Sequence, residues 1–345
     1  MSTALVTGGS GFFGGILKRV LLERGWSVIN VDLVKDDDAH PQLVSIQGDI
    51  RNRSVLDHAT AGRTVDVIFH CAAILAHAVK DKNFLWSCNV DGTRSVVEFA
   101  KARHVPKIIF TSSNCLWGEN FGRPIREDDD PNPVEIYGRS KLEGEKILVA
   151  ERGATDVVIF RCPTITDAGR LGLLAILFEF IDDGKKVWTV GGGLNRYQFI
   201  YAGDLADACI RAAAYPGTAI FNIGSDGVKS FREVYQEVID RAGSTSRVAS
   251  LPKKPTLFAM KILYKLGLSP LGPYQYKMIA EDFEFDTSSI KRELGWQPTL
   301  TNGEMLWKAY EFYREHRKDL AAGDHVSAHR QPAKMGVIRV LKWLS

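Results

Sequence analysis

The stretch ALVTGGSGFFGGILKRV, residues 4–20, joins a short apolar run, a glycine-rich turn and a segment whose apolar residues recur at helical spacing. Gly8, Gly11 and Gly14 form a G-x-x-G-x-x-G pattern in this turn. A side chain at Gly11 would block a pyrophosphate from approaching the backbone, and the free N–H groups at the helix start would hold the phosphates. A structural turn without a ligand is the alternative, but the flanking strand and helix favour a dinucleotide-binding turn.

The next predicted strand, WSVINVD (26–32), ends on Asp32, 24 residues after Gly8. A carboxylate at this position accepts hydrogen bonds from a ribose 2′-hydroxyl and repels a 2′-phosphate. The cofactor predicted from these residues is therefore NAD rather than NADP.

Strand-like and helical segments alternate along the first half of the chain. Strands that are apolar on both faces, separated by amphipathic helices, are typical of a parallel sheet covered on both sides. We therefore predict the α/β class with a doubly wound parallel sheet. The further predicted strands are 42–49, 65–73, 106–113 and 156–162, and the predicted helices are 12–25, 53–60, 81–104 and 137–152.

The composition of the 345 residues argues against several classes of protein. Lys and Arg total 44 and Asp and Glu total 41, and a net charge of +3 is too weak to indicate a nucleic-acid partner. The five cysteines form no C-x-x-C pair, so we expect no disulfide framework and no metal site. Without a secretory signal or an apolar run of ~18 residues, we expect a cytoplasmic protein. The acidic runs 36–38 and 127–130 are predicted to be solvated loops.

A candidate catalytic pair lies in EIYGRSKLEGEK (135–146), where Tyr137 and Lys141 are four residues apart. On a helix these side chains share a face. The ammonium of Lys141 would then lower the pKa of a phenol that titrates near ~10 in water, so that Tyr137 can take a proton from a substrate hydroxyl. By spacing alone a solvated pair is the favoured interpretation. The dinucleotide turn and Ser113, at the end of the strand IIFTSS, favour the catalytic one.

Further motifs follow in order along the chain: GDI (48–50), HCAA (70–73), NVDGT (89–93), TSSNCLWG (111–118), YGRSK (137–141), RCP (161–163), RYQFIYAGD (196–204) and FNIGS (221–225). Together with the glycine turn, their order and spacing over residues 3–310 resemble those of extended short-chain dehydrogenases/reductases, in the NAD-dependent epimerase/dehydratase branch. The resemblance implies a Rossmann domain and a smaller C-terminal substrate domain. It assigns 1–165 plus 196–224 to the first, 166–195 plus 225–320 to the second, and leaves 321–345 as a linker and amphipathic tail.

The resemblance also implies a role for single residues. Asp49 and Ile50 would flank the adenine, Ala72 and Ala73 would line the cofactor groove, and Pro163 would lie near the nicotinamide. Asn89 would either connect the sheet to a helix or take part in a proton relay. The residues implied in NAD binding are Gly8, Gly11, Phe12, Phe13, Gly14, Asp32, Asp49, Ile50, Ala72, Ala73, Asn89, Tyr137, Lys141 and Pro163. Ser113, Tyr137 and Lys141 would be catalytic, and Ser113, Thr164 and Arg196 would bind substrate.

Residues 114 and 115 reduce the number of reactions that the resemblance allows. In the dehydratase branch an Asp-Glu pair follows the serine strand, and here Asn114 and Cys115 stand in its place. This disfavours a 4,6-dehydratase and leaves an epimerase or a dehydrogenase/ketoreductase; an isolated Cys115 is interpreted as a packing residue. The favoured function is 4-epimerisation of a nucleotide sugar, with Arg196 contacting the diphosphate. Thr164 replaces a frequent asparagine, and the second arginine of nucleotide-sugar enzymes is missing from 274–284.

Two segments suggest another substrate class. Residues 251–272 are apolar and basic, and Met335, Ile338, Leu341 and Leu344 recur at helical spacing in the basic segment 333–345. The latter would lie on an anionic membrane surface or dock on its own domain or a second subunit. The membrane interpretation favours a lipid-linked sugar or a 3β-hydroxysteroid-like alcohol as substrate. A non-catalytic NAD sensor is a third hypothesis, and the resemblance implies a homodimer formed through helices 81–104 and 137–152.

Overall fold

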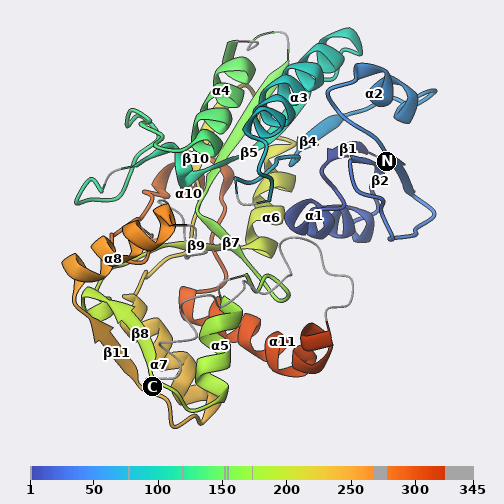
Figure 1. Cartoon of the computed structure of the whole chain (residues 1–345). Coiled ribbons are helices and arrows are strands. Elements are labelled where there is room, and N and C mark those ends of the chain that lie inside the picture. Colours follow the sequence, from blue (N-terminus) through green and yellow to red (C-terminus); the bar gives the residue numbers. More distant parts are fainter. Residues whose placement is uncertain are drawn as a thin grey trace.

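A seven-stranded sheet forms the centre of the computed structural model, which describes residues 2–322 apart from 77, 119, 151, 152, 154, 173 and 267–277 (Figure 1). The strand order is β10-β6-β5-β4-β1-β2-β3, and all neighbouring strands are parallel. The strands are β1 (Thr3–Thr7), β2 (Ser27–Asp32), β3 (Leu43–Gln47), β4 (Val67–His70), β5 (Lys107–Ser113), β6 (Asp156–Cys162) and β10 (Ala219–Asn222). The predicted α/β class and parallel sheet are confirmed, and β10 is a strand that the sequence analysis did not identify.

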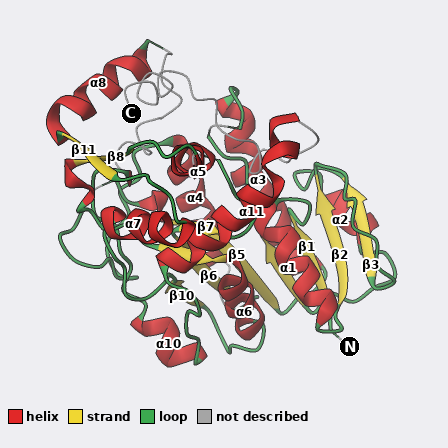
Figure 2. Ribbon diagram, turned by 90° about the horizontal axis from the view of Figure 1, so that it is seen from below, coloured by secondary structure: helices red, strands yellow, loops and turns green. Residues whose placement is uncertain are grey.

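Helices cover both faces of this sheet, because its strands are apolar on both sides. On one face α1 (Phe12–Glu23) and α6 (Ala202–Ala212) lie side by side over one apolar core (Figure 2). On the other face α2 (Arg53–Ala59), α3 (Lys82–Ala102) and α4 (Ile136–Ala150) cover a second core. The strand order reverses between β1 and β4, and ligands of such sheets bind at the carboxyl ends of the strands at this point.

The rest of the chain builds a third apolar core below the sheet in Figure 1, where α5 (Leu174–Asp182), α7 (Phe231–Ala242) and α11 (Asn302–Ala322) pack together. Two small parallel sheets join this part: β7 (Thr164–Thr166) with β9 (Phe199–Tyr201), and β8 (Val187–Val190) with β11 (Val248–Leu251). The remaining helices are α8 (Lys253–Lys265), α10 (Ser288–Leu294) and the 3-10 turns η1 (Asn114–Leu116) and η2 (Gly191–Gly193). The predicted tail at 333–345 lies outside the described residues.

None of the helices in the described part of the chain combines the length and the apolar character needed to cross a bilayer.

The prediction that the acidic runs are solvated loops is wrong for two of their residues. Asp36 forms an ion pair with Lys18, whose side chain is 1% exposed, and also accepts hydrogen bonds from Asn30 and Ser45. Glu127 is half-buried and accepts a hydrogen bond from a backbone amide of β10. Asp36 is held in the structure because the ammonium of Lys18 on α1 is buried, and a buried charge needs a partner of opposite sign.

The Lys18–Asp36 pair gives a stability prediction. Burial would raise the pKa of Asp36, but hydrogen bonds from Lys18 and Ser45 hold it below its usual value, so the carboxylate is the stable form. We expect Asp36→Ala to lower the free energy of unfolding by about 3 kcal/mol, because it leaves a buried ammonium poorly compensated. Chemical denaturation measures this change. The exposed neighbour Asp37 provides the control, and Asp37→Ala should change stability by no more than about 0.5 kcal/mol. Equal effects of the two substitutions would contradict the argument.

Candidate active site

The glycine turn brings the backbones of β1 and α1 and the loop after β4 into direct contact. Gly8 has φ +78°, and a Cβ there would lie 2.7 Å from the backbone N and Cα of Ala72. A Cβ at Gly14 would lie 2.1 Å from the carbonyl oxygen of Gly8. Gly11 is the N-cap of α1, and no side chain caps this helix end, so its first backbone amides face the turn. An unblocked helix N-terminus of this kind binds phosphate groups.

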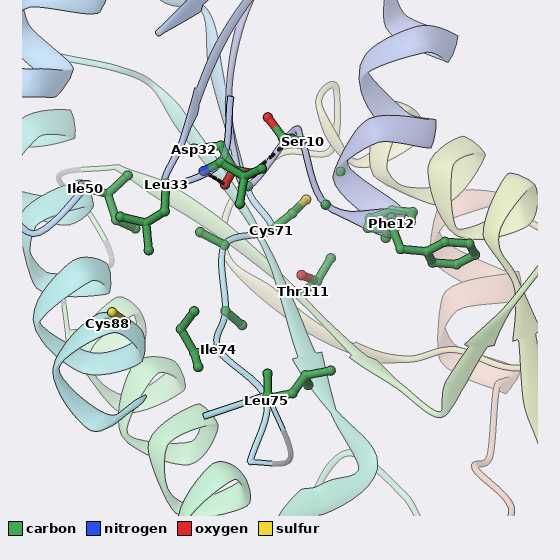
Figure 3. Close-up of a pocket in the computed structure, with 18 of the residues that line it drawn as sticks. Ser10, Phe12, Asp32, Leu33, Ile50, Cys71, Ile74, Leu75, Cys88 and Thr111 are labelled. Carbon is green, nitrogen blue, oxygen red and sulfur yellow. Dashed lines mark hydrogen bonds between the residues drawn. The ribbon is translucent and has the colours of Figure 1, made fainter. Parts of the chain in front are cut away.

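A cavity of about 400 Å³ opens at this turn, at the carboxyl ends of the strands (Figure 3). It brings together most of the residues implied in cofactor binding: Gly8, Gly11, Phe12, Phe13, Gly14, Asp32, Asp49, Ile50, Ala72, Ala73, Tyr137 and Lys141. The remaining sequence-predicted site residues do not line it, and these are Asn89, Ser113, Pro163, Thr164 and Arg196.

Asp32 ends β2 at the rim of the cavity, beside the glycine turn (Figure 3). Its two carboxylate oxygens accept hydrogen bonds from the backbone amides of Ser10 and Val34, each at 2.9 Å. Burial raises the pKa of Asp32 and repulsion from Asp36 adds to this, while the amide hydrogen bonds act in the opposite direction. The carboxylate is therefore held rigidly where a ribose hydroxyl can reach its remaining lone pairs.

The far end of the cavity is apolar, with one charged group. Ile50 is 7% exposed and lies against the open cavity. Asp49 pairs with Arg51, and this hydrogen bond lowers the pKa of the Asp49 carboxyl. Arg51 in turn lies over the ring of Phe84, 5.0 Å from its centroid. An apolar slot with an acceptor at its edge suits a flat heteroaromatic ring such as adenine.

Asn89 sits behind the cavity on α3 and is 4% exposed. Its side-chain oxygen accepts a hydrogen bond from the backbone N of Ile74 at 2.7 Å, and its Nδ2 donates to the Ile74 carbonyl and to Ser140 Oγ at 2.9 Å. These contacts tie the loop after β4 to α3 and α4. They match the connecting role, and a proton-relay role of Asn89 stays a hypothesis.

Tyr137 opens α4 and is partly exposed towards the cavity. Burial raises the pKa of its phenol, and repulsion from Cys115 adds to this. The charge of Arg170 and a hydrogen bond with Ser113 act in the opposite direction. The expectation of a lowered pKa is therefore not met, because desolvation of the phenolate outweighs the charge of Arg170 and the hydrogen bond with Ser113.

Lys141 lies one helical turn after Tyr137, and its side chain is 2% exposed. Its Nζ is 3.9 Å from the centroid of the Phe110 ring, an arrangement that stabilises a cation. Burial lowers the pKa of Lys141 to about 8, opposed by Cys162, Cys71 and the carboxylate of Glu145. An amine with this pKa is mostly protonated at neutral pH, so the buried side chain brings positive charge to the cavity.

The structure adds cavity residues that the sequence analysis missed. Arg170, in the loop after β7, lines the cavity and lies over the ring of Phe12, 5.2 Å from its centroid. Thr111, Ser112 and Cys71 line it from the ends of β5 and β4. The strand pattern places Thr111 and Ser112 directly before Ser113, and this signal could have identified them. No motif marks Arg170, because a loop inserted after β7 brings it to the cavity.

These residues fit a bound dinucleotide. At the glycine turn the backbones of Gly8, Gly14 and Ala72 lie too close for a Cβ, and α1 begins there without a side-chain cap that would cover its N-terminus. Ser112 Oγ is buried at the cavity wall without a hydrogen-bond partner in the described structure, although buried hydroxyls are almost always paired. The carboxylate of Asp32 lies where it would accept a hydrogen bond from a ribose hydroxyl.

Arg196 lies in a second cavity of about 200 Å³, lined by the loop 120–125, Arg196 and residues 282–284. The backbone N of Arg196 donates to Asp282 at 2.7 Å. Thr164, at the start of β7, is half-buried and lines neither cavity. In the described residues no cluster of three or more His, Cys, Asp or Glu side chains could hold a metal ion.

A parallel sheet with a glycine turn, a carboxylate at the end of β2 and a Tyr–Lys pair on α4 defines the class of extended short-chain dehydrogenases/reductases, enzymes that use NAD. The sequence matches the family described as the NAD dependent epimerase/dehydratase family over residues 4–224. The chain therefore belongs to this family of NAD-dependent enzymes. Because the members of this family are enzymes, the hypothesis of a non-catalytic NAD sensor is not supported.

Relatives extend over nearly the whole chain. A protein of Sinorhizobium fredii named uncharacterized protein y4nG is 39% identical over 345 residues, 99% of this chain and 86% of that protein. A UDP-glucose 4-epimerase of Mycolicibacterium smegmatis is 27% identical, over 90% of this chain and 98% of that protein. A 3 beta-hydroxysteroid dehydrogenase/Delta 5-->4-isomerase of Mycobacterium tuberculosis is also 27% identical, over 96% of both chains.

Solved structures support the fold. The UDP-glucose 4-epimerase of Thermotoga maritima, solved with UDP-glucose, superposes with a TM-score of 0.75 at 22% identity, over 92% of this chain and 100% of that one. The enzyme WbmG of Bordetella bronchiseptica, solved with NAD and UDP, gives 0.74 at 20% identity, over 91% and 94%.

The position of Asp32 predicts cofactor preference. We expect Asp32→Ala to weaken NAD binding about tenfold or more, because a hydrogen bond to a charged group is lost. It should weaken NADP binding less or improve it, since the repulsion of a 2′-phosphate is removed. Fluorescence titration of both cofactors measures the ratio, with Asp37→Ala as control. An unchanged NAD to NADP ratio would refute the ribose assignment.

The position of Arg170 predicts a pH effect. Its charge lowers the pKa of Tyr137, so Arg170→Gln should raise that pKa and reduce the fraction of phenolate at neutral pH. The rate should fall at neutral pH and recover at higher pH, whereas Arg170→Lys should keep the original profile. The dependence of kcat on pH tests this, and two profiles that coincide for Arg170→Gln and the wild type would exclude the effect.

Proposed function

We propose that this enzyme is a 4-epimerase of a nucleotide sugar that works through transient hydride transfer. The observation that carries the proposal is the hydrogen-bonded pair of Tyr137 and Ser113 beside Arg170 and the buried Lys141, at the rim of the dinucleotide cavity. A tyrosine phenolate stabilised by cations can accept the proton of a sugar hydroxyl, and the Ser113 hydroxyl next to it can orient the same oxygen.

The chain's residues would act as follows. Tyr137 takes the proton from the C4 hydroxyl while Ser113 donates a hydrogen bond to its oxygen. NAD would be held by the glycine turn and Asp32, and it would supply the hydride acceptor and donor for C4. After the 4-keto sugar has turned its other face, Tyr137 returns the proton to the carbonyl oxygen. Lys141 and Arg170 stabilise the phenolate that exists before the first transfer and again after the second.

The residues that replace the dehydratase Asp-Glu pair, Asn114 and Cys115, favour an epimerase over an enzyme that eliminates water. Asn114 is 3% exposed, and its Nδ2 donates a hydrogen bond to the hydroxyl of Tyr197 at 2.6 Å. The backbone N of Cys115 donates to Ser113 Oγ at 3.1 Å. Neither side chain is an acid that could remove and deliver the proton needed to expel water from a sugar.

A second candidate is a dehydrogenase acting on a 3β-hydroxysteroid-like or lipid-linked alcohol. The cavity around Arg196 favours it, since this arginine shares the site with the carboxylates of Asp282 and Glu284. Burial raises the pKa of Glu284, and the positive charge of Arg196 lowers it. Arg196 therefore already interacts with a carboxylate of this protein. A diphosphate would meet repulsion there. The steroid dehydrogenase relative supports the same candidate.

Isotope labelling separates the two candidates. UDP-glucose carrying deuterium at C4 should yield UDP-galactose with the deuterium retained and without net NADH, as NMR and mass spectrometry can show. A 3β-hydroxysteroid labelled at C3 should instead lose its deuterium to NAD, giving a ketone and labelled NADH. Turnover of only the second substrate would replace the first proposal with the second.

The same assay tests the acid/base role. Tyr137→Phe should lower turnover by about 10²–10⁴-fold, because the proton-transfer group is lost. It should leave NAD binding nearly intact, since the glycine turn and Asp32 are unchanged. A variant with a near-normal rate would remove Tyr137 from the proposed mechanism.

A further inference from the structure

Helix α8 (Lys253–Lys265) exposes large apolar side chains without any buried residue of its own. Phe258 is 68% exposed, Ile262 42%, and Leu266, the C-cap, 65%. In both views of the molecule α8 lies at the periphery, away from the seven-stranded sheet (Figures 1 and 2). Most large apolar residues of this chain are buried, so a strip of three exposed ones on one helix calls for a binding partner.

The side chains of α8 fall on three sides of the helix: a half-buried side, an exposed apolar side and a row of lysines. Thr256, Leu257, Met260 and Leu263 are half-buried and form the side that rests on the protein. Phe258, Ile262 and Leu266 recur every four residues and form an outward strip. Lys254, Lys261 and Lys265, spaced by seven and four residues, run along the edge of this strip.

The charge on this helix has one sign. Residues 251–266 contain four lysines and no Asp or Glu. Lys253 contacts Glu281 at 3.6 Å, whereas within the described residues Lys254, Lys261 and Lys265 are paired with no carboxylate. The outward face of α8 is therefore apolar and cationic together.

The covering surface must be anionic. The two longest undescribed segments of this chain, 267–277 and 323–345, hold five Lys and Arg and a single Asp, so they do not complement the lysines. A second copy of α8 would bring six lysines of the two outward faces together. A bilayer with anionic lipids offers both parts of the complement: negative headgroups for the lysines and an apolar interior for the strip.

We propose that α8 is an interfacial helix that docks this protein on the surface of an anionic lipid bilayer. The strip of Phe258, Ile262 and Leu266 enters the headgroup–acyl boundary. Lys254, Lys261 and Lys265 bind lipid phosphates at its edge. The proposal holds for either substrate class, because it rests on α8 and not on the cavity.

Vesicle flotation of the full NAD-loaded chain tests this. We expect binding to phosphatidylcholine vesicles that contain phosphatidylglycerol, and weak binding to pure phosphatidylcholine. Neutralising a lysine should reduce the partition coefficient about fivefold, so K254Q/K261Q/K265Q should reduce it about a hundredfold. F258S/I262S should reduce it about tenfold or more.

Control variants remove the same kind of charge or apolar side chain outside α8. K80Q/K82Q/K101Q changes three exposed lysines on and before α3, and Leu194→Ser removes a side chain that is 68% exposed. Both should bind vesicles nearly as well as the wild type, and all variants should keep NAD affinity as evidence of folding. A chain ending at 332 separates the contribution of the tail.

Three results would overturn the proposal. The first is no binding of the full chain to either vesicle. The second is vesicle binding that neither K254Q/K261Q/K265Q nor F258S/I262S reduces. This includes the case in which only the chain ending at 332 loses vesicle binding. The third is a fall in oligomer size caused by F258S/I262S without an effect on vesicle binding, which would make α8 an interface between copies or with another protein.

Discussion

The close approach of three backbones at the glycine turn is the constraint on which the site depends. Gly8 lies against the backbone of Ala72, and Gly14 lies against the carbonyl of Gly8, so β1, α1 and the loop after β4 meet without side chains between them. This contact directs the uncapped N-terminus of α1 at the switch point between β1 and β4. The N-terminus of α1, where a phosphate would bind, and the apolar slot beside Ile50 thereby share one cavity.

Buried charges connect the sheet to the helix that carries Tyr137. Arg161 on β6 forms an ion pair with Glu145 on α4, and both side chains are about 5% exposed or less. Glu145 also holds up the pKa of Lys141, one turn earlier on the same helix. The phenol of Tyr137 therefore sits on an element that is anchored electrostatically, and its own protonation balances desolvation against Arg170.

The two halves of the chain differ in how much their residues reveal about function. The dinucleotide half is built on close backbone contacts, which tolerate few residue types at each position, so its motifs are readable. The second cavity is instead formed by loops from both parts of the chain, 120–125 and 282–284 around Arg196, and helix α8 is exposed. Side chains on such elements adapt to the ligand or surface they meet, and few positions are restricted to one residue type.

Local patterns in the chain were sufficient for six of the seven strands of the parallel sheet, for helices α1 to α4, for the glycine turn and for the positions of Asp32 and Ile50 at the cavity. Each depends on a periodicity or a backbone conformation set by neighbouring residues. The burial of Asp36, the presence of Arg170 at the cavity, the net rise in the pKa of Tyr137 and the outward strip of α8 came from the folded chain alone. These features arise where segments far apart in sequence exclude water from one another, and desolvation depends on the whole surrounding shell.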